Sequence, residues 1–256
     1  MTGWDALDAE LARWVETGRR CPVWLRDDDA VAATPALGRF LTLCRSAGIA
    51  PGLAVIPAHA TPSLADPLRR HPEVAVLVHG WAHTNHAAAG EKKAEFGMGR
   101  SAEARRGDAA RGLETLNGLF TGRLLPLFVP PWNRMGADMP ELLASAGFRA
   151  ASGFGRRPEA ATTGFRWLNT QIDLIDWRGS RSAMETDALL DGLCRQLADR
   201  REQGGASIEP IGLLTHHLVH DAAVWRLLEA LLDRLAGHPA LDWPAVAVLI
   251  GEAARP

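Results

Sequence analysis

The sequence has few cysteines, almost no net charge and no long apolar run. Its three cysteines (Cys21, Cys44 and Cys194) are odd in number and lack CxxC spacing, which indicates buried thiols in a reducing compartment instead of disulfides. A formal net charge of −2 provides no basic field for nucleic acid. No segment approaches the ~20 apolar residues of a spanning helix, and the first residues contain no apolar signal segment. We therefore expect a cytoplasmic protein that neither binds nucleic acid nor inserts into a membrane.

The length and composition are those of a globular chain. The 256 residues are 47% hydrophobic and 23% charged, and they are enough for one α/β barrel. Without an internal repeat, a heptad pattern or a low-complexity linker, we expect one domain over 1–256 with its core at 21–236. No feature of the sequence indicates the oligomeric state.

Short apolar runs alternate with longer segments of helical periodicity, which predicts a parallel α/β sheet. The expected strands are 21–26, 52–56, 74–78, 124–129, 148–152, 172–176 and 211–215. The expected helices are 4–19, 35–47, 62–70, 101–120, 138–146, 184–203, 221–236 and 244–252. Seven strand–helix units suit either a barrel with fewer than eight strands or an open doubly wound sheet. The charged tract 91–100 is expected to be a surface loop that could lie over a site.

Unusual polar residues directly follow five of these strands. They are Asp27, Asp28 and Asp29; His79, Trp81 and His83; Trp132 and Asn133; Asp176, Trp177 and Arg178; and His216 and His217. In α/β barrels and open α/β sheets, the site forms at the carboxyl ends of the strands. Five strands thus bring acids, histidines and tryptophans to one rim.

The aspartates and the first histidine pair could form a metal site. Three adjacent aspartates commonly make a solvated turn or a helix cap, but after a buried strand their charges would repel unless a cation or a proton neutralised them. His79 and His83 have HxxxH spacing, which can direct both imidazoles to one ion, and His86 could replace either. The alternative is one surface and one core histidine. One aspartate with two histidines suits Zn²⁺ or another divalent ion.

The ordered series RDDD, HGWAH, PPWN, DW and LLTH, spanning residues 26–217, resembles the metal-dependent polysaccharide deacetylases. These proteins have a NodB homology domain and form family 4 of the carbohydrate esterases. The resemblance implies a distorted (β/α)₇ barrel and a divalent metal. Zinc is the expected ion, with cobalt, nickel or iron(II) as alternatives. The implied reaction removes an N-acyl group from a small or oligomeric sugar.

The resemblance also implies roles for individual residues. Of the family's two adjacent aspartates, the first is a general base and the second a metal ligand. They correspond to Asp27 and Asp28, or to Asp28 and Asp29 in the other register. The remaining ligands are His79 and His83, and the general acid is His216, or His217 if the register slips. Asp176 is expected to orient that histidine, although it could simply cap the end of a strand.

Two positions depart from the family pattern. Val129 stands where the third motif normally begins with an arginine that steadies the base. The replacement cation is Arg26, Arg134 or Arg178. Asp29 stands where the first motif normally ends in glycine. These departures indicate a divergent branch of the family.

Tryptophans within the motifs suggest how a sugar would bind, because an indole face can stack on a sugar ring. We expect Trp132, Trp81, Asn133 and Arg178 to contact substrate, with Trp132 the best stacking candidate and Trp24 in the core. The expected function is therefore a metal-dependent carbohydrate N-deacetylase. Alternatives are a metal amidase acting on a non-sugar N-acyl or ureide compound, and a non-catalytic carbohydrate-binding relative. A phosphoesterase is weaker, because the sequence has no glycine-rich phosphate cradle.

Overall fold

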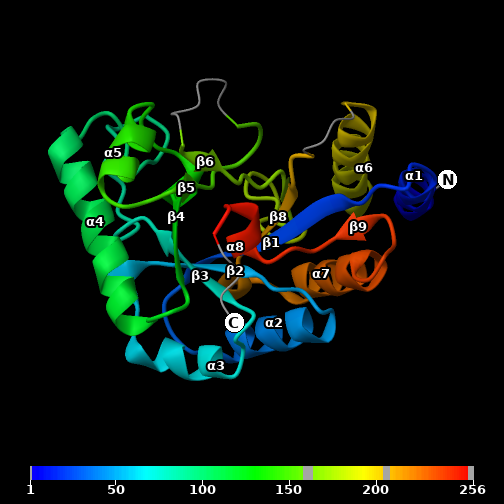
Figure 1. Ribbon diagram of the computed structural model, residues 1–256, viewed down its shortest axis with the longest axis horizontal. Helices are drawn as coiled ribbons and strands as arrows, with labels where there is room; N and C mark the ends of the chain where they lie inside the picture. The colour runs from blue at the N-terminus through cyan, green and yellow to red at the C-terminus, as the bar shows by residue number, and fades with distance from the viewer. Residues whose placement is uncertain (1, 158–163, 204–207, 253–256) are drawn as a thin grey trace.

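The computed structural model describes residues 2–157, 164–203 and 208–252, and its centre is a curled parallel sheet. The strands are β1 (Cys21–Ala30), β2 (Gly52–Val55), β3 (Ala75–His79), β4 (Leu124–Val129), β5 (Ala150–Ala151), β6 (Arg166–Trp167), β7 (Ile172–Asp173), β8 (Ile211–Thr215) and β9 (Leu241–Asp242). Their order is β6-β5-β4-β3-β2-β1-β8-β7, with β9 beside β1. All of these pairs are parallel. The sheet forms a half-barrel, which confirms the predicted fold class (Figure 1).

Helices surround this sheet (Figure 1). They are α1 (Gly3–Glu16), α2 (Pro35–Ser46), α3 (Ala65–Arg69), α4 (Ala102–Leu119), α5 (Met139–Ser145), α6 (Thr186–Gln203), α7 (Ala222–Leu235) and α8 (Val246–Leu249). The first and last helices are shorter than expected, and the two-residue strands β6 and β9 were not predicted. Within the described residues, no helix combines the length and the apolar composition needed to cross a bilayer.

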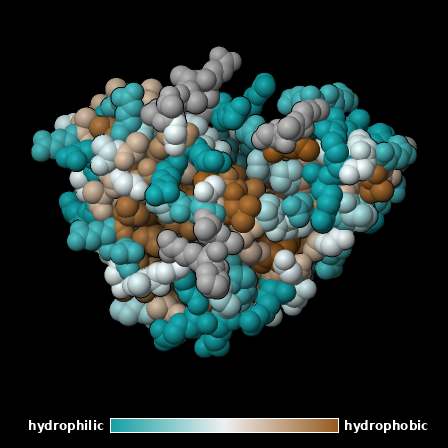
Figure 2. All heavy atoms as spheres, viewed as in Figure 1, coloured by the Kyte–Doolittle hydropathy of each residue, from teal (hydrophilic) through white to brown (hydrophobic). Residues whose placement is uncertain are grey.

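Two apolar cores lie on the two faces of the sheet. The larger one packs the outer face against the helices. The smaller one fills the inside of the curl, where Trp24 and Leu77 meet Val246 and Ile250 from the α8 segment. Figure 2 shows hydrophobic side chains gathered in the middle of the face on which α8 lies, with hydrophilic ones around the edge. The C-terminal segment therefore closes one end of the half-barrel.

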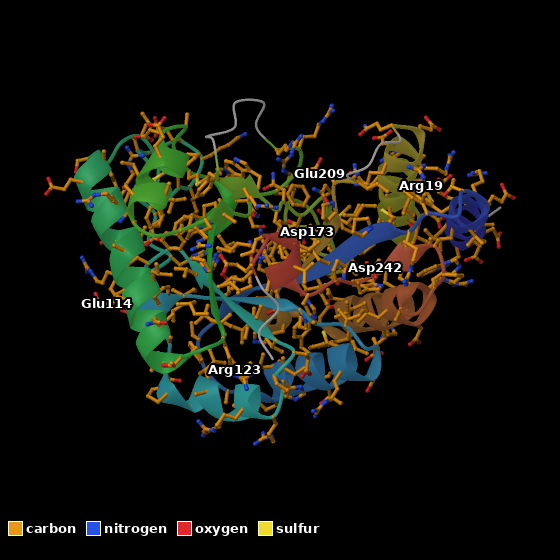
Figure 3. All side chains as sticks on the ribbon, in the orientation of Figure 1. Arg19, Glu114, Arg123, Asp173, Glu209 and Asp242 are labelled. Atoms are coloured by element: carbon orange, nitrogen blue, oxygen red, sulfur yellow. The ribbon has the colours of Figure 1, made fainter. Side chains whose placement is uncertain are left out.

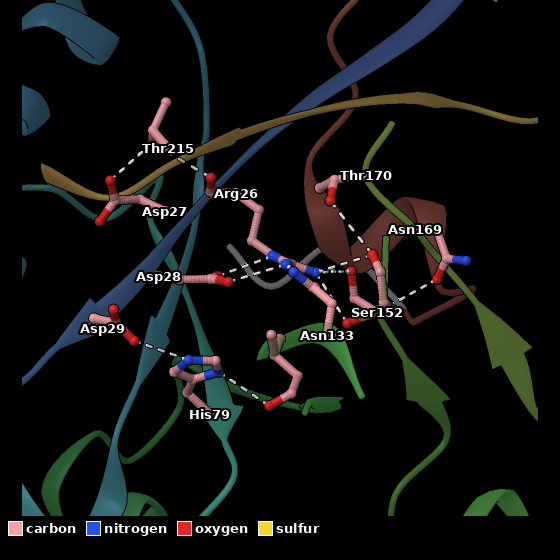
Figure 4. Close-up of polar contacts among 12 residues, drawn as sticks. Arg26, Asp27, Asp28, Asp29, His79, Asn133, Ser152, Asn169, Thr170 and Thr215 are labelled. Carbon is pink, nitrogen blue, oxygen red and sulfur yellow. Dashed lines mark hydrogen bonds and ion pairs between the residues drawn. The ribbon is translucent and has the colours of Figure 1, made fainter. Parts of the chain in front are cut away.

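The side chains of β1 alternate between these two cores, as expected for an extended strand. Val23 and Leu25 belong to the outer core, whereas Trp24 belongs to the inner one. The strand continues through the aspartates to Ala30 instead of ending at residue 26. The same alternation therefore sends Asp27 to the outer face and Asp28 to the inner face, and Figure 4 shows the two side chains leaving β1 in different directions.

Asp27 is fully buried and joins β1 to the end of β8. Its carboxylate accepts hydrogen bonds from the Thr215 hydroxyl at 2.7 Å and the His217 backbone amide at 2.8 Å, and it contacts His217 Nδ1. Burial acts to raise the pKa of Asp27, but the charge and hydrogen bond of His217 and the Thr215 hydroxyl lower it below its usual value. Burial likewise opposes ionisation of His217, yet Asp27 raises its pKa. This geometry is that of a buried structural ion pair.

Removing one partner should therefore destabilise the fold. We expect Asp27→Asn to lower the free energy of unfolding by about 3–5 kcal/mol, because the variant leaves a buried imidazolium without its counter-charge. Urea unfolding followed by circular dichroism measures this change. Asp8→Asn is the matched control, since Asp8 pairs with Arg234 at the surface and should change the free energy by no more than about 1 kcal/mol.

The stability difference should also depend on pH. The lowered pKa of Asp27 gives stability that is lost as the pH falls below about 4, and the raised pKa of His217 gives stability that is lost as the pH rises above about 6.5. The difference between wild type and Asp27→Asn should hence be largest between these values. A pH-independent difference would contradict the assignment of an ion pair.

Candidate metal centre and active-site pocket

Three side chains at the carboxyl ends of β1 and β3 form a cluster suited to a metal ion. Ligand atoms of Asp29, His79 and His83 all lie within 4.8 Å of one another. Asp29 Oδ1 is 3.0 Å from His79 Nε2 and 3.4 Å from His83 Nε2. Ligands about 2.0–2.1 Å from a tetrahedral zinc ion lie roughly 3.3 Å apart, so the cluster needs little rearrangement to hold one. The donor set of one carboxylate and two imidazoles also fits a catalytic zinc site.

The aspartate in this cluster is Asp29 and not Asp28, which corresponds to the second of the two sequence registers. In a regular strand Asp29 would point to the same outer face as Asp27. Its backbone is instead left-handed, with φ at 72°. This conformation breaks the alternation and directs two consecutive carboxylates, Asp28 and Asp29, into the same pocket. Asp27 is not among the residues that line the pocket.

His79 is oriented for metal binding by the backbone of β4. Its Nδ1 donates to the Val129 carbonyl at 3.0 Å, which leaves Nε2 directed at Asp29. Burial acts to lower the pKa of His79, but Asp28 and Asp29 raise it. Burial and the charge of His79 lower the pKa of His83.

The loop that carries His83 is held by Glu95, which the sequence analysis did not single out. The Glu95 carboxylate accepts hydrogen bonds from the backbone amides of Trp81 at 3.1 Å, Ala82 at 2.8 Å and Thr84 at 3.3 Å. Glu95 is 1% exposed. The expectation of a surface loop over 91–100 was thus wrong at its centre, because a buried carboxylate there satisfies three loop amides.

Arg26 is the arginine that contacts Asp28. Its Nη2 donates to Asp28 Oδ2 at 2.9 Å, and its Nε lies 2.9 Å from Oδ1 (Figure 4). Nη1 donates to the Ser152 carbonyl and hydroxyl, and Nη2 also donates to Asn133 Oδ1. Arg26 and Asp28 are two positions apart on β1, so they share its inner face. The two arginines considered beside it, Arg134 and Arg178, lie at the rim of the pocket.

The cluster opens into a cavity of about 660 Å³. Its lining residues are Asp28, Asp29, His79, His83, Lys93, Trp132, Asn133, Arg134, Phe154, Asp173, Trp177, Arg178, Arg181, His216 and Val219. The loops after β1, β3, β4, β7 and β8 therefore meet at one rim, as predicted from the motif positions. Trp81 and His86 are not in this lining. Trp81 packs under Arg111 of α4, whose guanidinium is 4.7 Å from the indole centroid, and His86 is exposed.

His216 lines the pocket, whereas His217 is turned toward Asp27. The His216 ring lies edge-on to Trp177, with 4.8 Å between centroids. Asp176 is not paired with His216, because its carboxylate accepts from the backbone amides of Arg178, Gly179 and Ser180. That geometry is the strand-end cap considered as its alternative role.

Asp173 is the acidic residue that shares the pocket with His216, and it was missed because β7 was expected to extend to residue 176. Burial raises the pKa of Asp173 and the charge of His216 opposes this shift. Its Oδ2 accepts from Trp177 Nε1 at 2.9 Å. Figure 3 shows Asp173 near the middle of the fold, whereas Glu114 projects outward from α4.

Strained backbone is concentrated in this pocket. Within the described residues, the non-glycine residues with positive φ are Asp29, His83, Trp132, Asn133 and Arg181, and all five line the cavity. Such conformations cost of order 1–3 kcal/mol each for most residue types and tend to persist at functional sites. Their clustering indicates that the positions of these side chains are maintained at the expense of stability.

Known proteins resemble this chain in fold. No family model matches it, and no curated protein sequence does. A Mycobacterium smegmatis protein assigned as a polysaccharide deacetylase has a TM-score of 0.67 and 17% identity, covering 91% of this chain and 90% of its own. A family 4 carbohydrate esterase from Streptomyces lividans, solved with acetate, has a TM-score of 0.58 and 17% identity, covering 92% and 98%. The chain thus has the fold of the family 4 carbohydrate esterases.

The same fold also occurs in a non-catalytic protein. A family 4 pseudoenzyme from Bacillus anthracis has a TM-score of 0.60 and 13% identity, covering 91% of this chain and 66% of its own. The fold by itself therefore does not establish catalysis, and the case for it depends on the residues in the pocket.

The role of Glu95 can be tested through metal affinity. We expect Glu95→Ala to weaken zinc binding by about 10–100-fold, because three unpartnered amides would release the loop that carries His83. Competition with a chromophoric chelator measures the affinity. Glu91→Ala is the control, since Glu91 lies in the same tract but is exposed, and its zinc affinity should equal that of wild type. Equal affinity in Glu95→Ala would contradict the role of Glu95.

Proposed function

We propose that this protein is a divergent family 4 carbohydrate esterase that removes an N-acyl group, such as acetyl, from a sugar. The observation that carries the proposal is one pocket that holds a three-ligand cluster, a carboxylate beside it and a histidine across from it. The comparisons supply the architecture, and these side chains supply the chemistry. A cytoplasmic location is part of the proposal and comes from the sequence.

Asp29, His79 and His83 would hold the metal ion, for which we propose zinc. The ion would supply an acidified water and a positive charge for the acyl oxygen. The chain keeps the ligands ready for it, because Val129 fixes the tautomer of His79 and Glu95 fixes the loop of His83. Ligands fixed in this way lose little freedom on binding the ion.

Asp28 would act as the general base. It lines the pocket next to Asp29 and is 2% exposed, so it can accept the proton of an attacking water through a carboxylate oxygen. Arg26 donates to Asp28 Oδ2, lies 2.9 Å from Oδ1, and is itself fixed by Ser152 and Asn133. Arg26 is therefore a positioning residue that keeps the carboxylate in one orientation.

His216 would act as the general acid. It reaches the pocket from the end of β8, next to Trp177, and would donate its proton to the departing amine nitrogen. We propose Asp173 in place of Asp176 as the acidic partner of His216, because Asp173 lines the same pocket and Asp176 does not. Trp132 and Trp177 would provide apolar walls for the sugar ring.

Two alternatives remain distinct from this proposal. A non-catalytic carbohydrate-binding relative would not need a base and an acid, yet Asp28 and His216 both line the pocket beside the ligand cluster. A metal amidase for a non-sugar N-acyl or ureide compound would use the same groups. The tryptophan walls favour a sugar over such a compound.

Metal content and acetate release, measured on the same variants, test the proposal. We expect the purified protein to bind about one equivalent of zinc and to release acetate from an N-acetylated sugar. Asp28→Asn and His216→Ala should keep the zinc and lose about 10²–10⁴-fold in kcat, because each removes one proton-transfer group. His79→Ala should lose both zinc and activity.

His86→Ala is the matched control, because His86 is in the same histidine-rich stretch but is exposed and outside the pocket. It should keep both zinc and activity. Zinc binding without acetate release from any N-acetylated sugar would favour the non-catalytic relative or the amidase. Wild-type turnover in both Asp28→Asn and His216→Ala would refute the acid–base assignment.

A further inference from the structure

The rim of the pocket carries four cationic side chains that the mechanism above does not use. They are Lys93, Arg134, Arg178 and Arg181, and each lines the cavity. Within residues 2–157, 164–203 and 208–252, none of the four forms an ion pair. Many other surface arginines do, including Arg39 with Glu229 and Arg234 with Asp8. The rim therefore offers positive charge that the protein itself leaves uncompensated.

The acidic residues of the pocket do not cancel this charge. Its three carboxylates are Asp28, Asp29 and Asp173. Arg26, which is buried behind the pocket lining, already pairs with Asp28, and Asp29 belongs to the ligand cluster. Asp173 alone is left to face four cations. The pocket thus has a positive field, which a low-dielectric wall of aromatic side chains focuses on its contents.

The sheet order places these cations on both sides of the reaction centre. Lys93 and Arg134 come from the loops after β3 and β4, whereas Arg178 and Arg181 come from the loop after β7. Strand β1, with the catalytic carboxylates, lies between β3 and β7 in the order β4-β3-β2-β1-β8-β7. A substrate whose acyl group reaches Asp28 and Asp29 would therefore meet Lys93 and Arg134 on one side of the pocket, or Arg178 and Arg181 on the other.

Both cationic loops are held by specific contacts. Arg134 Nη1 donates to the Lys93 carbonyl at 3.1 Å, which joins the first pair. The second pair lies on the turn that Asp176 caps, and the Arg181 amide donates to the Asp176 carbonyl at 2.8 Å. Arg181 also has a φ of 56°, an unfavourable conformation for a side chain of its size. An arginine that only contacts solvent would not need a strained backbone, so the conformation of Arg181 indicates that its position at the rim matters.

We infer that the pocket selects N-acylated sugars that carry a negatively charged group, a phosphate or a carboxylate, over neutral sugars. Guanidinium groups bind both anions through paired hydrogen bonds, so the two share one chemistry. The inference rests on the proposed function for the acyl group that is removed, and it adds the class of substrate.

Binding and turnover of three probes test the inference. The probes are the methyl glycoside of N-acetylglucosamine, N-acetylglucosamine 1-phosphate and N-acetylmuramic acid, which are neutral, phosphorylated and carboxylated. Calorimetry on the zinc-loaded protein gives Kd, and acetate release gives kcat/KM. We expect at least one anionic probe to bind about ten- to a hundredfold more tightly than the neutral one. Salt should reduce this preference by screening.

Variants locate the effect. Arg178→Met and Arg181→Met should each lower the preference for the anionic probe by about tenfold. Arg226→Met is the control, because Arg226 is exposed on α7 and outside the pocket, and it should leave the preference unchanged. Comparing Kd for the phosphate probe with Kd for the carboxylate probe shows which of the two anions the rim prefers.

Equal Kd values for the neutral and anionic probes would overturn the inference, as would a preference that survives replacement of all four rim cations. If instead the proposed function is wrong, no probe will release acetate. Because Kd is measured separately, the selectivity for anions is decided even in that case.

Discussion

The alternation of side chains along β1 is the constraint on which the site depends. It directs Arg26 and Asp28 inward and Asp27 outward, so neighbouring carboxylates have different surroundings and different tasks. Asp27 becomes part of the packing against His217, and Asp28 becomes the carboxylate of the pocket. The left-handed backbone at Asp29 then adds a second carboxylate to the same pocket. Three identical residues in a row are thereby separated into one buried structural carboxylate and two carboxylates of the pocket, for which we propose proton transfer and metal binding.

Arg26 supplies the positive charge that two neighbouring carboxylates in one pocket require. A buried carboxylate beside a second carboxylate would favour protonation unless a cation compensated it. Val129 in β4 cannot supply that charge, and an arginine two positions before Asp28 on the same strand can. The cation and the carboxylate that we propose as the base thus come from one strand.

Much of the fold could be predicted from the sequence, because strand and helix periodicities are local and were clear for most elements. The meeting of five strand ends also followed from the parallel arrangement. The register within the aspartate triplet could not be predicted, since it depends on a positive φ at Asp29 that no local pattern signals. Glu95 was missed because it meets the loop of His83 only in the folded chain, and Asp173 was missed because β7 ends at residue 173 and not at 176. Had the first strand been predicted to run to Ala30 instead of Arg26, the alternation of side chains would have placed Asp27 and Asp28 on opposite faces of the sheet.

The central claim is that Asp29, His79 and His83 hold the catalytic ion while Asp28 stays free of it. Anomalous diffraction at the zinc absorption edge, from crystals of the zinc-loaded full chain, tests this most directly. The account predicts one strong peak within about 2.0–2.2 Å of Asp29, His79 and His83, with Asp28 still paired to Arg26. A peak coordinated by Asp28 or Asp27, or a zinc-loaded protein without a peak at this cluster, would contradict it.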